Sequence, residues 1–141
     1  MLEPRAAHSS CAIQSDDGST QCIIVIGGWQ TKNGRYLKSV EILNMKNIKS
    51  HWSIGTKWPI SNKKWIQGPP LPCEVRHAKC VPLPLVTNFA SVIIGGWDGR
   101  DELVNRYSSD VYGLNKKLTE WKLLGKIKTG RYNHTAIPLS K

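Results

Sequence analysis

The sequence predicts an all-β protein made of short antiparallel strands, and an internal repeat is the main evidence. An apolar strand that ends in two glycines and a tryptophan occurs twice, as Cys22–Trp29 and as Ser91–Trp97. Self-similarity of this kind is typical of repeat architectures, in which each copy is one supersecondary unit. No segment shows a helical 3.6-residue period over a useful length, and the short, turn-rich connections favour antiparallel pairing.

Two further strands are predicted after each glycine pair. A strand with Val and Asn follows as Ser39–Asn44 in the first copy and as Asp110–Asn115 in the second. A strand that begins with tryptophan comes next, at Trp65 and at Trp121. Each copy therefore supplies three strands in the same order.

An Arg/His segment that leads into small and apolar residues opens each copy. It occurs three times, as Arg5–His8, Arg76–His77 and Arg131–His134, and the middle copy departs from the Arg-x-x-His spacing. In this register the three arginines occupy the same turn in successive units. The sequence thus predicts two four-stranded units and the opening strand of a third, with a hairpin loop at Ser15–Ser19 inside the first.

Together these motifs resemble the kelch repeat, which joins a glycine-pair strand, a Val/Tyr strand, a spaced Trp and an Arg/His opening. The resemblance covers almost all of the chain and implies β-propeller blades of about 50 residues each. On this basis residues 5–75 form a first blade, with a lysine-rich insertion at 45–64, residues 76–130 form a second, and residues 131–141 open a third. Because propellers close with about four to eight blades, we expect a propeller fragment whose open edges allow self-association.

Packing is the role expected for the most regular motif residues. Glycines at the end of an apolar strand permit a sharp turn and close approach of neighbouring backbones. Tryptophans supply large apolar faces that fill the space between adjacent blades. The residues assigned to this structural motif are Gly27, Gly28, Gly95, Gly96, Trp65 and Trp121.

The cysteines carry no metal-binding pattern, because none of Cys11, Cys22, Cys73 and Cys80 forms a Cys-x-x-Cys motif. Cys11 and Cys22 flank the hairpin loop, so a disulfide between these two residues is an alternative. We favour free thiols and a reducing, cytoplasmic location, since no signal peptide is visible. The apolar runs are too short to cross a membrane.

The sequence carries no recognisable catalytic signature, whether a nucleophile elbow, a zincin helix or a phosphate-binding loop. We therefore expect a protein that is not an enzyme and uses no cofactor or metal. An enzyme on the same fold, with metal-dependent chemistry, is the alternative that the resemblance allows. A second alternative is the substrate-recognition part of a ubiquitin-ligase adaptor.

The net charge of +10 favours acidic partners. Part of the excess lies in the insertion 45–64, which contains no acid and which we interpret as a solvated loop. Trp52 and Trp58 in it could stack on bases, but no zinc-finger, RRM or KH signature accompanies them, so nucleic acid is not the expected partner.

The predicted function is a non-catalytic module that binds another protein, with an acidic segment as the expected ligand. The resemblance implies that partners dock on loops at one end of the propeller. Arginine and aromatic residues are also the types enriched at binding hot spots. The candidate contacts are Arg5, Arg76 and Arg131 from the openings, and Trp29, Arg35, Tyr36, Trp97, Asp98 and Arg100 from the loops.

Overall fold

The computed structural model describes residues 1–14, 21–45, 65–84, 87–98 and 107–138. Within these ranges the chain forms β-strands and no helix, and every paired strand is antiparallel to its neighbour. The prediction of an all-β antiparallel fold is therefore confirmed. The loop at Ser15–Ser19 and residues 46–64 of the insertion predicted at 45–64 lie outside the described residues.

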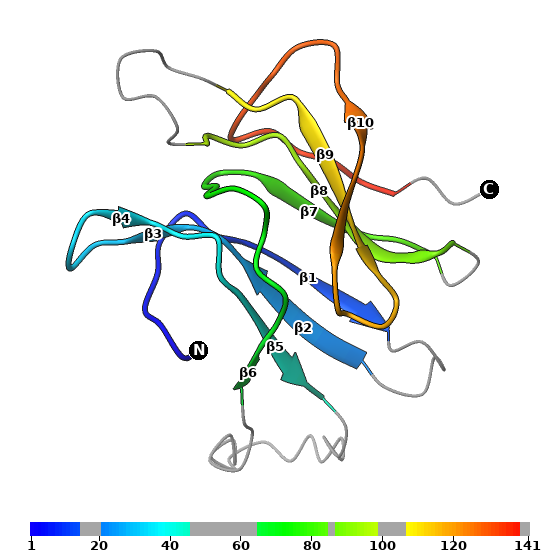
Figure 1. The fold of residues 1–141 in the computed structure, drawn as a ribbon, viewed down its shortest axis with the longest axis horizontal. Coiled ribbons are helices and arrows are strands. Elements are labelled where there is room, and N and C mark those ends of the chain that lie inside the picture. Colours follow the sequence, from blue (N-terminus) through cyan, green and yellow to red (C-terminus); the bar gives the residue numbers. More distant parts are fainter. Residues whose placement is uncertain (15–20, 46–64, 85–86, 99–106, 139–141) are drawn as a thin grey trace, which may run out of the picture.

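Two four-stranded sheets form the body of the molecule (Figure 1). The first has the order β1 (Ser9–Gln14), β2 (Gln21–Ile26), β5 (Val40–Asn44) and β6 (Trp65–Gln67). In each sheet the strands follow one another in chain order, as the repeat predicts.

The second sheet repeats this arrangement with β7 (Lys79–Pro82), β8 (Phe89–Ile94), β9 (Asp110–Asn115) and β10 (Trp121–Lys126). A small additional hairpin, β3 (Trp29–Gln30) with β4 (Arg35–Tyr36), projects from the first sheet (Figure 1). The repeat pattern in the sequence did not predict this hairpin.

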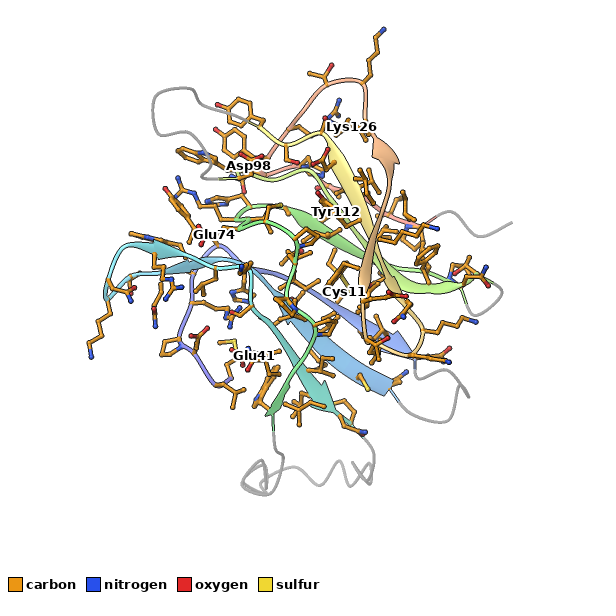
Figure 2. The ribbon with its side chains drawn as sticks, in the orientation of Figure 1. Cys11, Glu41, Glu74, Asp98, Tyr112 and Lys126 are labelled. Atoms are coloured by element: carbon orange, nitrogen blue, oxygen red, sulfur yellow. A yellow bond between two sulfur atoms is a disulfide. The ribbon has the colours of Figure 1, made fainter. Side chains whose placement is uncertain are left out.

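An apolar core joins the two sheets, with β1 lying against β7. Ile24 of β2 and Leu114 of β9 are fully buried in it. Figure 2 shows Cys11 and Tyr112 in the space between the sheets. Trp121 also packs against this core, and its indole Nε1 donates a hydrogen bond to the Pro69 carbonyl at 2.9 Å, which links the second sheet to the segment that follows β6.

Trp65 lies on the opposite face of its sheet from this core. It pairs with Leu43, and neither residue belongs to the core cluster between the sheets. Trp121 pairs in the same way with Leu114. The two tryptophans thus hold equivalent positions in their sheets, but only Trp121 packs against the core between the two sheets.

Cys11 and Cys80 form a disulfide between β1 and β7, with their Cα atoms 5.8 Å apart. The expectation of free thiols is therefore wrong for these two residues, as is the alternative pairing of Cys11 with Cys22. The physical reason is the strand register, which places Cys22 opposite Ile13 and Cys11 opposite Ile24. Cys11 instead bonds to Cys80 of the second sheet, so these two cysteines give no support to a reducing compartment.

The three opening segments share one backbone geometry, which sets the true repeat register. Ala7, His77 and Asn133 all have φ values of 53° or 54°. The His77 N–H donates to the Ala7 carbonyl at 2.9 Å, and the Asn133 N–H donates to the His77 carbonyl at 3.0 Å. These three residues are therefore equivalent.

The prediction that three arginines occupy the same turn is consequently wrong for Arg76. Ala6 forms a β-bridge with Trp29, and Arg76 forms the same bridge with Trp97, so Arg76 is the equivalent of Ala6. One residue further back, Arg5 and Arg131 share their position with Val75. The error comes from aligning Arg76–His77 to an Arg-x-x-His pattern from which it departs.

The glycine pairs sit where the opening segment of the following repeat touches the preceding sheet. The Gly28 N–H donates to the Val75 carbonyl at 2.7 Å, and the Gly96 N–H donates to the Arg131 carbonyl at 2.8 Å. Gly95 has φ of +60°, and a Cβ there would lie 2.5 Å from the Arg131 carbonyl oxygen. Positive φ and lack of space together require glycine at this position.

Replacing Gly95 by alanine is expected to damage the fold more than the same change at Gly34. Gly34 has nearly the same φ, +64°, but a Cβ there would meet nothing within 4 Å. Gly34→Ala should therefore cost only the conformational term of about 1 to 2 kcal/mol. Gly95→Ala should lose about 1 to 3 kcal/mol more from the steric overlap. Urea unfolding followed by tryptophan fluorescence measures both, and equal losses would contradict this packing.

Candidate functional site

The candidate site lies at the end of the two sheets where the glycine-pair turns, the opening segments and the β3–β4 hairpin meet. Backbone bonds fix these elements together: the Arg76 N–H donates to the Trp97 carbonyl at 3.0 Å, and the Trp97 N–H donates to the Arg76 carbonyl at 2.8 Å. Tyr36 reaches the same place from β4, where it pairs with Trp29. Residues from both repeat units therefore converge at this end.

Arg76 is held between two aromatic rings, and we call Tyr36, Arg76 and Trp97 the Arg76 stack. The guanidinium carbon lies 3.8 Å from the Trp97 ring centroid and 4.8 Å from that of Tyr36. The two ring centroids are 6.4 Å apart and the rings are inclined at 37°. Cation–π attraction to both rings restrains the guanidinium without neutralising its charge.

The Arg76 side chain makes no hydrogen bond or ion pair with the described residues, and its Nε is buried. Because the rings cover its faces, the outer edge of the guanidinium is left to bind an acceptor. That edge carries N–H donors in a fork that matches a carboxylate. The Arg76 stack is thus a restrained cation suited to an anionic group.

A second aromatic group lies beside it, and we call Tyr107, Tyr132 and His77 the Tyr132 stack. The Tyr107 and Tyr132 rings are nearly parallel, at 15°, with centroids 4.6 Å apart. The His77 ring meets Tyr132 edge-to-face at 6.1 Å, and its Nδ1 lies 3.1 Å from Oδ1 of Asn133. Tyr107 and Tyr132 remain 40% and 42% exposed, so this group presents aromatic surface to solvent.

Arg5 belongs to the framework of the fold. Its side chain is completely buried and forms an ion pair with Glu41, which is 2% exposed and labelled in Figure 2. The guanidinium also donates to the carbonyls of Gly27 at 2.9 Å and Ser39 at 3.1 Å. Glu41 further accepts the backbone N–H of Glu3 at 3.1 Å. Arg5 is therefore not placed to contact a partner.

The other predicted contact residues differ in how exposed they are. Arg131 and Arg35 are exposed, and Trp29 is half-buried. Asp98 is 2% exposed, so its carboxylate is part of the interior at this end (Figure 2). Arg100 lies outside the described residues. The structure thus brings Tyr36, Arg76 and Trp97 into direct contact and leaves Arg5 and Asp98 in the framework.

Tyr107, Tyr132 and His77 were missed by sequence reasoning. The backbone pairing reveals their place: Trp97 forms bridges with both Arg76 and Tyr107, which makes Tyr107 the equivalent of Tyr36. Tyr132 directly precedes Asn133 and so holds the position of Arg76 in the third opening. The one-residue error in the register concealed this equivalence.

His134 is the last residue of the third opening segment, and both its ring nitrogens are buried without a hydrogen-bond partner among the described residues. A Cβ on Gly95 would lie 3.2 Å from its Cε1 atom, so the imidazole packs on the glycine-pair turn. Burial lowers the pKa of His134 from its ordinary value of 6.5, and the positive charges of Arg131 and Lys79 lower it further. The native structure therefore favours neutral His134.

Comparison with known proteins adds no identification. No protein-family model matches the chain, and a search of curated proteins finds no significant match. In the part of the chain that the structure describes, no helix could span a membrane, and no three or more His, Cys, Asp or Glu residues gather as metal ligands would.

Removing the Arg5 side chain is expected to destabilise the protein, whereas removing that of Arg131 is not. Arg5→Ala leaves the buried Glu41 carboxylate without its charge partner, and breaking such a pair typically costs about 3 to 5 kcal/mol. Arg131→Ala removes an equal charge from an exposed position and should change the free energy of unfolding by less than about 0.5 kcal/mol. Urea unfolding measures the free energy of unfolding of both variants. A stable Arg5→Ala variant would show that the Arg5–Glu41 pair does not support the fold.

His134 should make stability depend on pH in the mildly acidic range. Its pKa is lower in the folded chain than in the unfolded chain, so the unfolded chain binds the proton first as the pH falls. The contribution of neutral His134 to the free energy of unfolding is fully present above the ordinary pKa of 6.5 and is lost as the pH falls below it. Unfolding free energies measured between about pH 7.5 and 5.5 should decline more in the wild type than in His134→Leu. Identical slopes would mean that His134 is not buried as described.

Proposed function

We propose that the two sheets are blades of a kelch-type β-propeller and that the chain is a non-catalytic module that binds an acidic segment of another protein. The equivalence of two four-stranded units, joined through an apolar core and glycine-pair turns, supports the blade assignment. The family name rests on the sequence resemblance alone. The binding site is the end of the molecule that carries the Arg76 stack.

The single observation that carries the proposed function is the Arg76 guanidinium, restrained between Trp97 and Tyr36 without an acidic partner among the described residues. A cation whose position is already fixed loses little side-chain entropy when it binds an anion. In this respect Arg76 differs from Arg5, whose charge is already compensated by Glu41.

The charges at this end also favour an acidic ligand. Lys32, Lys38, Arg35 and Arg131 are exposed there or close by. The acids are fewer: Asp98 is buried, and Glu74, labelled in Figure 2, is half-buried. An excess of positive charge attracts an acidic segment over long range, whereas the guanidinium fork of Arg76 supplies the specific contact. The partner contacts that we propose are Arg76, Arg131, Trp29, Arg35, Tyr36 and Trp97.

Selection from a random peptide library displayed on phage tests this function. We expect the selected peptides to be enriched in Asp and Glu and to compete for one site. Arg76→Ala should weaken the binding of a selected peptide by about 1 to 3 kcal/mol, as hot-spot residues do. Arg76→Lys should lose most of the same affinity, because lysine keeps the charge but not the planar fork.

Lys122→Ala is the matched control, since it removes one exposed charge from β10 near the opposite end of the second sheet. It should change affinity by no more than the loss of one screened charge. Peptides without acidic enrichment would contradict the proposed ligand, and so would equal losses in Arg76→Ala and Lys122→Ala.

A further inference from the structure

The Cys11–Cys80 disulfide fastens the first repeat to the second. Cys11 belongs to β1 and Cys80 to β7, and the two residues are 69 positions apart in the sequence. Figure 2 shows Cys11 in the space between the two sheets. We call the contact of β1 and its opening segment with β7 and its opening segment the first seam. Both sides of this seam lie in the described residues.

Two hydrogen bonds run along the first seam beside the disulfide. The His77 N–H donates to the Ala7 carbonyl at 2.9 Å, and the Cys80 N–H donates to Oγ of Ser9 at 2.6 Å. Arg76 directly precedes the first of these donors. The disulfide therefore belongs to the set of contacts that fix where the Arg76 backbone lies against the first repeat.

The Arg76 stack depends on this seam, because its members come from both repeats. Tyr36 is part of the first repeat, whereas Arg76 and Trp97 belong to the second. A change in how the two repeats are held alters the place of Tyr36 relative to the guanidinium. The stack thus responds to whatever tightens or loosens the first seam.

The cysteine pair is confined to the seam that carries Arg76. Counting from the equivalent residues of positive φ in the three opening segments, Val81 takes the place of Cys11 and Ala136 takes the place of Cys80. The seam between the second and third opening segments therefore has its backbone hydrogen bond but no cysteine pair. The covalent link is consequently a feature of one seam and not of the repeat.

We propose that the Cys11–Cys80 pair is a redox switch that sets the affinity of the Arg76 stack for its acidic partner. This inference rests on the proposed function and adds regulation to it. The disulfide holds the first seam closed. Reduction leaves the seam to hydrogen bonds and apolar packing, so a smaller fraction of molecules holds Arg76 between both rings. Apparent affinity falls in proportion to that fraction.

Thiol–disulfide exchange with glutathione operates the switch. Cys11 is half-buried and Cys80 is buried, so a glutathione thiolate attacks Sγ of Cys11. The S–S bond breaks, and Cys80 leaves as a thiolate that takes up a proton. A second glutathione thiolate attacks the glutathione sulfur of the mixed disulfide and releases Cys11 as a thiol. Two glutathiones thereby become one glutathione disulfide, which is the oxidant of the reverse reaction.

Comparison of the whole chain in excess glutathione disulfide and in excess glutathione tests the switch. Alkylation followed by mass spectrometry should count two more thiols in the reduced form, since Cys22 and Cys73 are free in both. The Arg76 Hδ protons should show the larger upfield ring-current shift in the oxidised form. Acetyl-hexaglutamate amide, which contains no thiol, should bind the reduced form at least about threefold more weakly.

Cysteine variants separate the switch from other effects of the buffers. Cys11→Ala and Cys80→Ala break the same bond, so each should bind the peptide equally in both buffers and as weakly as the reduced wild type. Cys22→Ala is the matched control, because it removes a buried thiol outside the pair and should keep the difference between the buffers. Burial raises the pKa of the Cys22 thiol, which disfavours its reaction with glutathione disulfide.

The switch is excluded if glutathione releases no thiol from the folded chain, if the reduced chain unfolds as followed by tryptophan fluorescence, or if both forms bind the peptide equally. Failure of the proposed function looks different. If the oxidised chain binds no acidic peptide, the function fails, while the Arg76 Hδ shift still shows whether the disulfide controls the stack. If both forms bind equally through Arg76, the function stands and only the switch falls.

Discussion

Each glycine-pair turn is closed by a hydrogen bond to the opening segment of the next repeat, and the remaining structure depends on this contact. The Gly28 N–H reaches the Val75 carbonyl, and the Gly96 N–H reaches the Arg131 carbonyl. A side chain on the first glycine of each pair would occupy the space of that carbonyl, and one on the second would meet the opening segment of its own repeat, so both must be glycine. The contact fixes where the next opening segment begins, and thereby places Arg76 between two rings and Tyr132 on one.

Three arginines of similar sequence context serve different purposes because their surroundings differ. Arg5 is buried against Glu41 and contributes to stability. Arg76 is restrained by aromatic rings and keeps its charge available. Arg131 is exposed, and its backbone carbonyl, rather than its guanidinium, contacts the glycine pair. The binding function that we propose for this end therefore depends on the stacked arginine, with exposed charges adding long-range attraction.

Much of the fold could be predicted from the sequence, because strand order follows from a repeated pattern of glycines, tryptophans and apolar runs. The candidate site was predicted only in part. Tyr36, Arg76 and Trp97 were named, but Arg5 and Asp98 were placed on the surface because burial depends on tertiary partners that spacing does not reveal. Tyr107 and Tyr132 were missed through a one-residue register error. The Cys11–Cys80 disulfide was missed because it joins strands 69 residues apart in the sequence.

The central claim is that two repeat units meet so that Arg76 lies between Tyr36 and Trp97. Nuclear Overhauser contacts of the Arg76 side chain in solution test it most directly, since Tyr36 and Trp97 belong to different repeats. The account predicts contacts from the Arg76 Hδ protons to both rings, together with an upfield ring-current shift of those protons. Arg76 Hδ signals at random-coil positions, with contacts to neither ring, would contradict it.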